Sequence, residues 1–277
     1  MLAPTIRPVT IADLLNLEPQ GDDRWHGHSP VPTGRSDLFG GQVAAQALSA
    51  ASRTVASGHL ANSVHCYFMR RGDPAVPLEI SVDRVRDGRT YSSRRIEVCQ
   101  NGKPIFEMLA SFHVDEPGDE YDHAMPQSVP DPDELAPRSL TPGADHGLDV
   151  RIVPVEAPLV RWWGRVPTTF PDDPAMHLCA LLYASDLRAG SAAIMAIGHD
   201  DSTPMELRPK DGPIVNFGSL DHALWFHRVP RVDEWFFVEV KPMTVRDSRG
   251  LVLGTIFDRQ GVHLATFTQE MFLKVAL

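Results

Sequence analysis

The sequence predicts an α+β fold in which one structural unit occurs twice along the chain. Similar motifs recur about 160 residues apart, each half opens with an apolar helix, and several strands follow each helix. With 277 residues, 43% of them hydrophobic and 22% charged, the chain is long enough to bury a core in both halves. We therefore expect one unit at 1–114, a linker at 115–149 and a second unit at 150–277.

In the first unit, a helix is expected to follow Phe39, where Val43, Ala47, Leu48 and Ala51 recur at helical spacing. Strands are predicted at 78–85, 91–99 and 105–114, because apolar and β-branched residues alternate with polar ones there. Residues 65–70 and 86–89 correspond to 223–228 and 246–249 in the second unit. Several matching pieces in the same order favour duplication of a whole domain over chance similarity of two hairpins.

The segment 115–149 differs from both of its flanks. It holds ten acidic residues and one basic residue, Arg138, together with six prolines and no apolar periodicity. This composition is typical of an extended, solvated linker. The segment could equally be a loop packed on the fold, because Tyr121, Met125 and Leu135 could dock.

In the second unit, Asp172-Asp173-Pro174 is a strong helix start, with an acidic cap and a proline in the first turn. Residues 178–184 are apolar on nearly all sides, which predicts a buried helix. Strands are expected at 235–240, 251–257 and 264–273, again by alternation.

Composition excludes several classes of function. The formal net charge is −10, and most of it lies in the segment 115–149, so the chain has no basic face for nucleic acid. There is no Gly-x-Ser-x-Gly elbow, phosphate loop or dinucleotide fingerprint. We expect no membrane span and no secretory signal. Three scattered cysteines favour neither disulfides nor zinc, and the reducing cytoplasm is the expected compartment.

Three features could carry chemistry. Asp186 ends an almost wholly apolar helix, so it is either a partnered carboxylate or one that has already reached solvent. Gln269 shares a strand face with apolar residues, and a buried amide needs hydrogen-bond partners. Ser219, Asp221 and His222 suggest a triad, but neighbouring residues of a strand point apart, which argues against one.

Several motifs together resemble those of the acyl-CoA thioesterase II family, over about 39–272. The matching residues are Phe39-Gly40-Gly41-Gln42, Arg71-Gly72-Asp73-Pro74, Arg86-Asp87-Gly88-Arg89, Gln100-Asn101-Gly102-Lys103-Pro104-Ile105-Phe106, Ala110-Ser111-Phe112, Tyr183-Ala184-Ser185-Asp186, Leu220-Asp221-His222-Ala223-Leu224-Trp225-Phe226-His227-Arg228 and Thr268-Gln269-Glu270. The resemblance implies a double hotdog fold, in which each repeat wraps an antiparallel sheet around a central helix. It also implies a homo-oligomer.

The resemblance further implies hydrolysis of fatty acyl-CoA to fatty acid and CoA, with no cofactor, metal or covalent intermediate. In the family, an Asp, a Thr or Ser, and a Gln surround one water, and these positions fall on Asp186, Ser219 and Gln269. A helix N-terminus at Gly40 and Gly41 is the expected oxyanion site. The sequence departs from the family in having a serine where threonine is usual, and a polar insertion at 199–211.

Other interpretations stay open. Asp172 and His177 have the spacing of a hotdog enoyl-CoA hydratase, although the accompanying proline is misplaced. A non-catalytic acyl-CoA binder would fit if one catalytic residue were lost. His26 and His28 form a metal-like pair without a third ligand. The candidates for attracting CoA phosphates, most of them expected to be ordinary strand-surface residues, are Arg70, Arg71, Arg84, Arg86, Arg89, Arg94 and Arg95.

Overall fold

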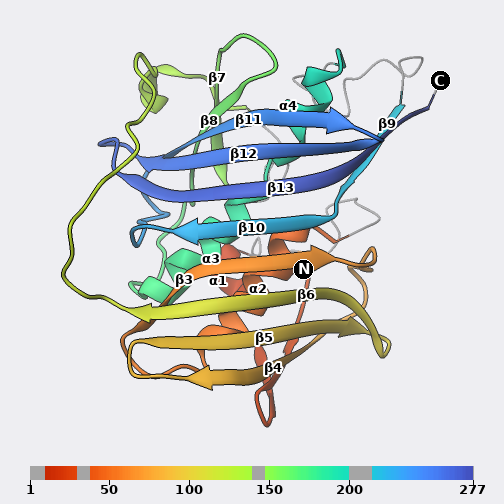
Figure 1. Ribbon diagram of the computed structural model, residues 1–277, viewed down its shortest axis with the longest axis vertical. Coiled ribbons are helices and arrows are strands. Elements are labelled where there is room, and N and C mark those ends of the chain that lie inside the picture. The colour runs from red at the N-terminus through yellow and green to blue at the C-terminus, as the bar shows by residue number, and fades with distance from the viewer. Residues whose placement is uncertain (1–9, 30–37, 139–146, 200–213, 277) are drawn as a thin grey trace, which may run out of the picture.

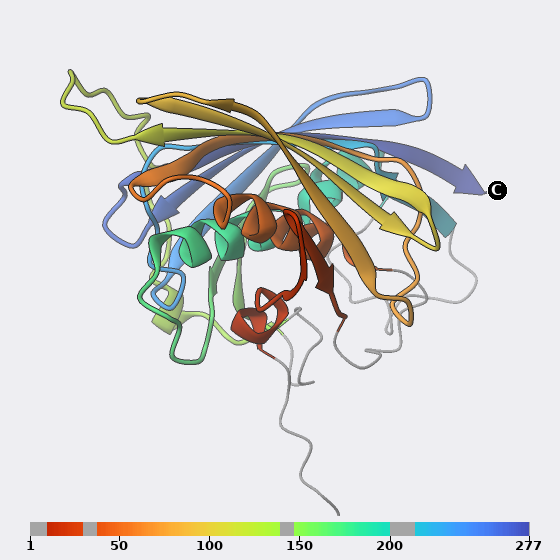
Figure 2. The same cartoon turned by 90° about the horizontal axis from the view of Figure 1, so that it is seen from below.

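The computed structural model describes residues 10–29, 38–138, 147–199 and 214–276. One 13-stranded antiparallel sheet arches over the helices (Figures 1 and 2). The helices are α1 (Ile11–Leu14), α2 (Gly40–Ser52), α3 (Pro174–Ser185) and α4 (Ala189–Ala196), with a 3-10 turn, η1, at Pro132–Glu134. The strands are β1 (Glu18–Gly21), β2 (Arg24–Gly27), β3 (His59–Phe68), β4 (Leu78–Asp87), β5 (Tyr91–Gln100), β6 (Lys103–Val114), β7 (Asp149–Val153), β8 (Val160–Arg165), β9 (Ile214–Ser219), β10 (Asp221–Phe226), β11 (Phe236–Arg246), β12 (Arg249–Asp258) and β13 (His263–Ala276).

The strand order shows the duplication directly. One half of the sheet runs β1-β2-β4-β5-β6-β3, and the other continues as β10-β13-β12-β11-β8-β7, with β9 also paired to β13. At the centre, His65 of β3 faces Ala223 of β10. These two residues are also equivalent in the sequence repeat, and a residue that faces its own counterpart lies at a pseudo-two-fold axis. The chain is thus a double hotdog, as the resemblance implies.

Helix α2 is more deeply buried than its apolar stripe predicts. All residues from Gly41 to Ala51 are buried, including Gln46 and Ser49. The sheet covers one side of α2 and α3 packs against another (Figure 2). The small side chains of this alanine-rich helix allow that close approach.

Helix α3 begins where the sequence predicts. Pro174 is its first residue, and the Asp173 carboxylate accepts a hydrogen bond from the Ala175 N–H (2.9 Å). By length and composition, Pro174–Ala196 is the one described stretch that could cross a membrane, but 83% of its most apolar window is buried inside the molecule. That burial is expected of a core helix in a globular fold.

All of the predicted strands are found, and all but β11 and β13 end within two residues of their expected ends. Strands β4, β5, β6, β12 and β13 contain the predicted ranges, and β11 starts one residue later than expected and runs on to Arg246. Buried residues alternate with less buried ones along most of β5, β6 and β12, as period-two patterning requires.

Residues 115–138 of the acidic segment lie on the second half of the molecule. Its residues Met125, Val129 and Leu135 pack against an apolar cluster, whereas Tyr121 is exposed. The cluster consists of Val153, Trp163, Trp235, Phe237 and Phe257. Of the two alternatives that the sequence leaves open, the packed loop is therefore the one observed.

Polar contacts add to this docking. The Trp163 indole N–H donates to the Pro130 carbonyl oxygen (3.0 Å), which gives the buried ring its partner. The Arg259 guanidinium pairs with both Asp131 and Asp133 at 2.7 Å. The linker of Figure 1 thus runs along the second sheet half and is held at several points.

Candidate active site

Asp186 follows the last residue of α3, and its carboxylate reaches the first turn of α2. The Gly41 N–H donates to Asp186 Oδ2 at 2.8 Å. Helix α2 has no capping side chain of its own, because Phe39 occupies its N-cap. The positive end of α2 therefore lies beside a carboxylate that the negative end of α3 alone would disfavour. Of the two expectations for Asp186, the partnered carboxylate is observed.

Gly40 and Gly41 allow the two helix ends to approach. A Cβ on Gly40 would lie 2.8 Å from Asp186 Oδ2, and one on Gly41 would collide with the Tyr183 carbonyl oxygen. A larger side chain therefore does not fit at either position. Helix α2 begins at Gly40, as the sequence predicts.

Ser219 and Gln269 converge on the same carboxylate from two other elements. Gln269 Nε2 lies 2.9 Å from Asp186 Oδ1 and 2.7 Å from Ser219 Oγ. Ser219 Oγ is itself 3.4 Å from Asp186 Oδ1. The structure therefore brings the three sequence-predicted residues together, with the Gly41 N–H on the other carboxylate oxygen.

Gln269 occupies the buried face of β13, as alternation predicts. Only 2% of the residue is exposed, and its same-face neighbours Ala265, Phe267 and Met271 are fully buried. In such surroundings every polar atom of the amide needs a partner. Its nitrogen has two, and its oxygen is met by His222.

His222 is a site residue that the sequence analysis did not assign. Its Nδ1 lies 2.7 Å from Gln269 Oε1, and its Nε2 lies 2.9 Å from Ser185 Oγ. The ring is stacked on Phe267 and is almost completely buried. Burial lowers the pKa of His222, so the ring is neutral near pH 7.

A bulge explains why strict alternation missed this residue. Four steps separate Ser219 from Ala223 along β9 and β10, but only three separate their partners Met271 and Thr268 on β13. The extra residue lets Ser219 and His222 both point inward, although an unbroken strand would set them on opposite faces.

Asp221 takes no part in a triad. Its Oδ1 accepts the Glu270 N–H at 2.9 Å, so the side chain replaces a backbone partner at the bulge. The expectation that Ser219, Asp221 and His222 form no catalytic triad agrees with these contacts. The polar residues at this strand start thus serve two purposes: Asp221 stabilises the bulge, whereas Ser219 and His222 belong to the candidate site.

Among the candidate arginines, several have clear structural roles. Arg94 is completely buried and donates to the Thr54 hydroxyl (2.7 Å) and carbonyl (2.9 Å) beyond the end of α2. Arg84 pairs with Asp23 on the surface. Arg71 contacts Asn216 on β9, the strand that ends at Ser219.

The competing site residues are not brought together. Asp172 pairs with Arg231 on the surface, whereas His177 is buried and its Nδ1 accepts the Val232 N–H (3.2 Å). His28 lies 3.2 Å from Glu18 in an exposed pair. In the part of the chain that is described, no group of three His, Cys, Asp or Glu side chains is arranged to hold a metal ion. Most of the insertion at 199–211 lies outside the described residues.

The first half of the molecule has a counterpart of the site without its polar groups. Residues of the two halves can be matched by counting along the strands from the pair at the pseudo-two-fold axis. Val64 then corresponds to His222, and Ala110 corresponds to Gln269. Val64 and Ala110 are paired and fully buried. The residue that caps the end of α2 is Arg53, where α3 has Asp186. Of the two symmetric positions, the second half alone carries this polar set.

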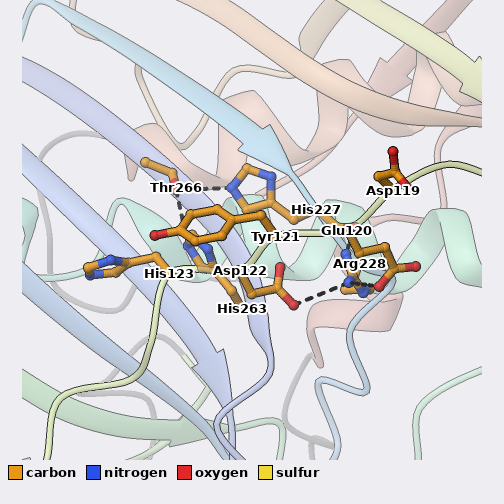
Figure 3. Close-up of a pocket in the computed structure, with 9 residues that line it drawn as sticks. All are labelled: Asp119, Glu120, Tyr121, Asp122, His123, His227, Arg228, His263 and Thr266. Atoms are coloured by element: carbon orange, nitrogen blue, oxygen red, sulfur yellow. Dashed lines mark hydrogen bonds and ion pairs between the residues drawn. The ribbon is translucent and has the colours of Figure 1, made fainter.

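A separate hollow of about 450 Å³ lies beneath the linker (Figure 3). Its lining residues are Asp119, Glu120, Tyr121, Asp122, His123, His227, Arg228, His263 and Thr266. Thr266 Oγ1 lies 3.0 Å from His227 Nε2 and 3.1 Å from His263 Nε2. Thr266 points to the face of β13 opposite to Gln269, so the sheet separates this hollow from the site.

Comparison with known proteins supports the assignment made from the motifs. The model of the acyl-CoA thioesterase N-terminal domain matches residues 28–113, and that of the C-terminal domain matches 116–273. Human acyl-coenzyme A thioesterase 8 is 33% identical, with 98% of this chain and 90% of the relative covered.

Solved structures are also similar to this chain over nearly its whole length. The acyl-CoA thioesterase II TesB2 of Mycobacterium marinum is 34% identical with a TM-score of 0.81, over 96% of this chain and 99% of that one. A hot dog fold protein of Alicyclobacillus acidocaldarius, 18% identical with a TM-score of 0.75 over 96% and 98%, shares the fold. Since both domain models match in order and together span most of the sequence, this chain belongs to the acyl-CoA thioesterase family.

Proposed function

We propose that this protein hydrolyses fatty acyl-CoA thioesters to free fatty acid and CoA, with Asp186 as general base on a water held by Ser219 and Gln269. The observation that carries the proposal is the convergence of these three side chains from α3, β9 and β13 within hydrogen-bond distance. A carboxylate accepts a proton, while the hydroxyl and amide can each orient a water without reacting.

The reaction needs no covalent intermediate. Asp186 takes a proton from the water, and the resulting hydroxide adds to the thioester carbonyl carbon. The tetrahedral intermediate then collapses, the C–S bond breaks, and the CoA thiolate leaves and is protonated by Asp186 or by solvent. Holding the water in place removes orientational entropy from the barrier.

The N-terminal end of α2 can stabilise negative charge in the site. The Gly41 N–H holds the base, and we assign the Gly40 N–H to the carbonyl oxygen that becomes negative in the transition state. The absence of a Cβ at both positions lets the start of α2 lie directly against the Asp186 carboxylate and the end of α3. The same helix end thus supports both the base and the oxyanion.

Replacing Asp186 with Asn tests this assignment. The amide has nearly the same shape but cannot accept the proton, so kcat for thiol release should fall at least about 1000-fold, with a much smaller change in KM. The measurement is release of free CoA thiol from a series of saturated acyl-CoAs. The matched control is Asp247→Asn, which changes an exposed carboxylate in the β11–β12 turn.

Three results would contradict the proposal. Wild-type activity in Asp186→Asn would remove the general base from the mechanism. Binding of acyl-CoA without thiol release by the wild type would favour the non-catalytic binder, and loss of enoyl-CoA absorbance without thiol release would favour the hydratase. Hydrolysis by wild type and control alone supports the assignment and shows the preferred chain length.

A further inference from the structure

His222 connects the catalytic amide to the end of α3. It lies between Gln269 Oε1 (2.7 Å from its Nδ1) and Ser185 Oγ (2.9 Å from its Nε2). Ser185 directly precedes Asp186 in the sequence. The contacts therefore run from the Asp186 carboxylate through Gln269 and His222 to the residue before Asp186. All three side chains of the chain, Ser185, His222 and Gln269, are almost completely buried.

The acceptor on one side fixes the orientation of the Gln269 amide. The Asp186 carboxylate presents oxygen acceptors, so the amide must turn its NH₂ group toward it. With the amide flipped, Oε1 would face the carboxylate and a buried N–H would face His222. The amide oxygen therefore points at His222, and an oxygen there can only accept.

This orientation determines the tautomer of His222. Nδ1 must carry the proton that Gln269 Oε1 accepts, so in a neutral ring Nε2 is an acceptor. The Ser185 hydroxyl then donates to Nε2, although the Leu182 carbonyl oxygen is also within reach at 2.8 Å. Burial lowers the pKa of His222, which agrees with a neutral ring.

We propose that His222, protonated at Nδ1, is a positioning residue that holds the Gln269 amide with its NH₂ toward Asp186 and Ser219. This rests on the proposed function, because it matters for catalysis only if Gln269 orients the attacking water. His222 itself does not touch that water. Its loss would let the amide rotate, and a water misplaced by about 1 Å can cost on the order of 100-fold in rate.

The tautomer is tested on the wild-type protein by long-range ¹H–¹⁵N NMR of labelled histidine. The expected spectrum shows one buried ring protonated at Nδ1, and its signals disappear in His222→Asn. A His222 ring protonated at Nε2 would overturn the proposal. This measurement needs neither activity nor a stable variant other than the one used for assignment.

Two substitutions separate the roles of the ring nitrogens. In His222→Asn, the side-chain nitrogen occupies nearly the position of Nδ1 and can still donate to Gln269, so kcat should stay within about 3-fold of wild type. In His222→Gln, the amide reaches the Nε2 position and the donor to Gln269 is lost, so kcat should fall about 10- to 100-fold with KM nearly unchanged. Equal kcat in both variants, at either level, contradicts positioning through Nδ1.

A double-mutant cycle tests whether His222 acts through Gln269. In the Gln269→Ala background, adding His222→Gln should reduce kcat by less than about 2-fold, because the amide to be positioned is already absent. A further 10- to 100-fold loss would show an independent role and overturn the proposal. If the wild type releases no thiol at all, the proposed function fails, while the NMR result still reports the tautomer.

Discussion

At the residue scale, the decisive feature is the carboxylate that lies between two helix ends of opposite polarity. Asp186 caps α3, where a negative charge is disfavoured, but it receives an N–H from the start of α2. A single side chain therefore connects the two repeats, and the same contact holds the proposed general base in place. The contact depends on backbone approach, and the two glycines can be used to test it separately.

Gly40→Ala and Gly41→Ala should differ in a diagnostic way. A Cβ on Gly40 meets the Asp186 carboxylate and the Phe68 ring, so kcat should fall at least about 10-fold. A Cβ on Gly41 meets the backbone of α3, so the free energy of unfolding should also fall, by about 1–3 kcal/mol. Thiol release and urea denaturation provide the two readouts.

The control for both substitutions is Gly118→Ala, because no atom lies near the position of its added Cβ. It should leave activity and stability at wild-type values. A Gly40→Ala protein with unchanged kcat would show that the carboxylate tolerates displacement, which contradicts the proposed role of Asp186 as a fixed base.

How far the sequence predicts the site depends on the residue. Alternation along one regular strand predicts that Gln269 is buried, and its place at the end of an apolar helix singles out Asp186 but leaves its surroundings open. The family resemblance is what assigns both residues to one site. Ser219 is assigned by the resemblance as well. His222 was missed because the bulge near Leu220 changes the facing of side chains, and a bulge depends on pairing with β13 that local sequence does not reveal.

At the element scale, the two central helices were predictable and the linker was only partly so. An apolar stripe locates α2, and an acidic cap with a proline followed by an apolar run locates α3. Whether an acidic, proline-rich segment docks depends instead on a distant apolar surface formed by Trp163, Phe237 and Phe257. Sequence patterns that are local along the chain carry no information about such a surface.

The relative weight of charge and apolar contact in the linker can be tested with two variants. Leu135→Ser removes apolar packing on the cluster, so a protease should cut within 115–138 several times faster than in wild type. Arg259→Gln removes two exposed ion pairs, which salt screens, and should have little effect at physiological ionic strength. Faster cleavage of Arg259→Gln than of Leu135→Ser would show that charge holds the linker.

At the scale of the whole molecule, one observation summarises the architecture. The strand order of the second half mirrors that of the first, and the pair formed by His65 and Ala223 marks the axis between them. The fold class was predictable because duplication leaves similar motifs in the same order. The register at the axis was not predictable, since nothing in the sequence states that β3 and β10 join the halves.

Acidic pH should destabilise the whole fold. The pKa values of His177, His222, His227 and His263 are all lowered, with burial as the largest cause. Below the usual histidine pKa of about 6.5, the unfolded chain binds protons that the folded chain does not, so the free energy of unfolding falls as pH decreases. The melting temperature should therefore fall between pH 7.5 and pH 5.

The pH prediction has its own control. Replacing His227 with Asn should flatten this dependence without removing it, because the other three histidines remain. A melting temperature that is constant or rises as pH falls from 7.5 to 5 would contradict the assignment of these histidines as neutral in the folded state.

The empty counterpart of the site, with Val64 and Ala110 in place of His222 and Gln269, has a consequence for how such a protein can change. In a dimer of identical single repeats, every substitution appears twice, so neither copy can lose its chemistry alone. Fusion of the repeats into one chain removes that constraint. One half can then keep the proposed catalytic residues while the other is selected for packing, and the proposed mechanism gives each polypeptide one active site.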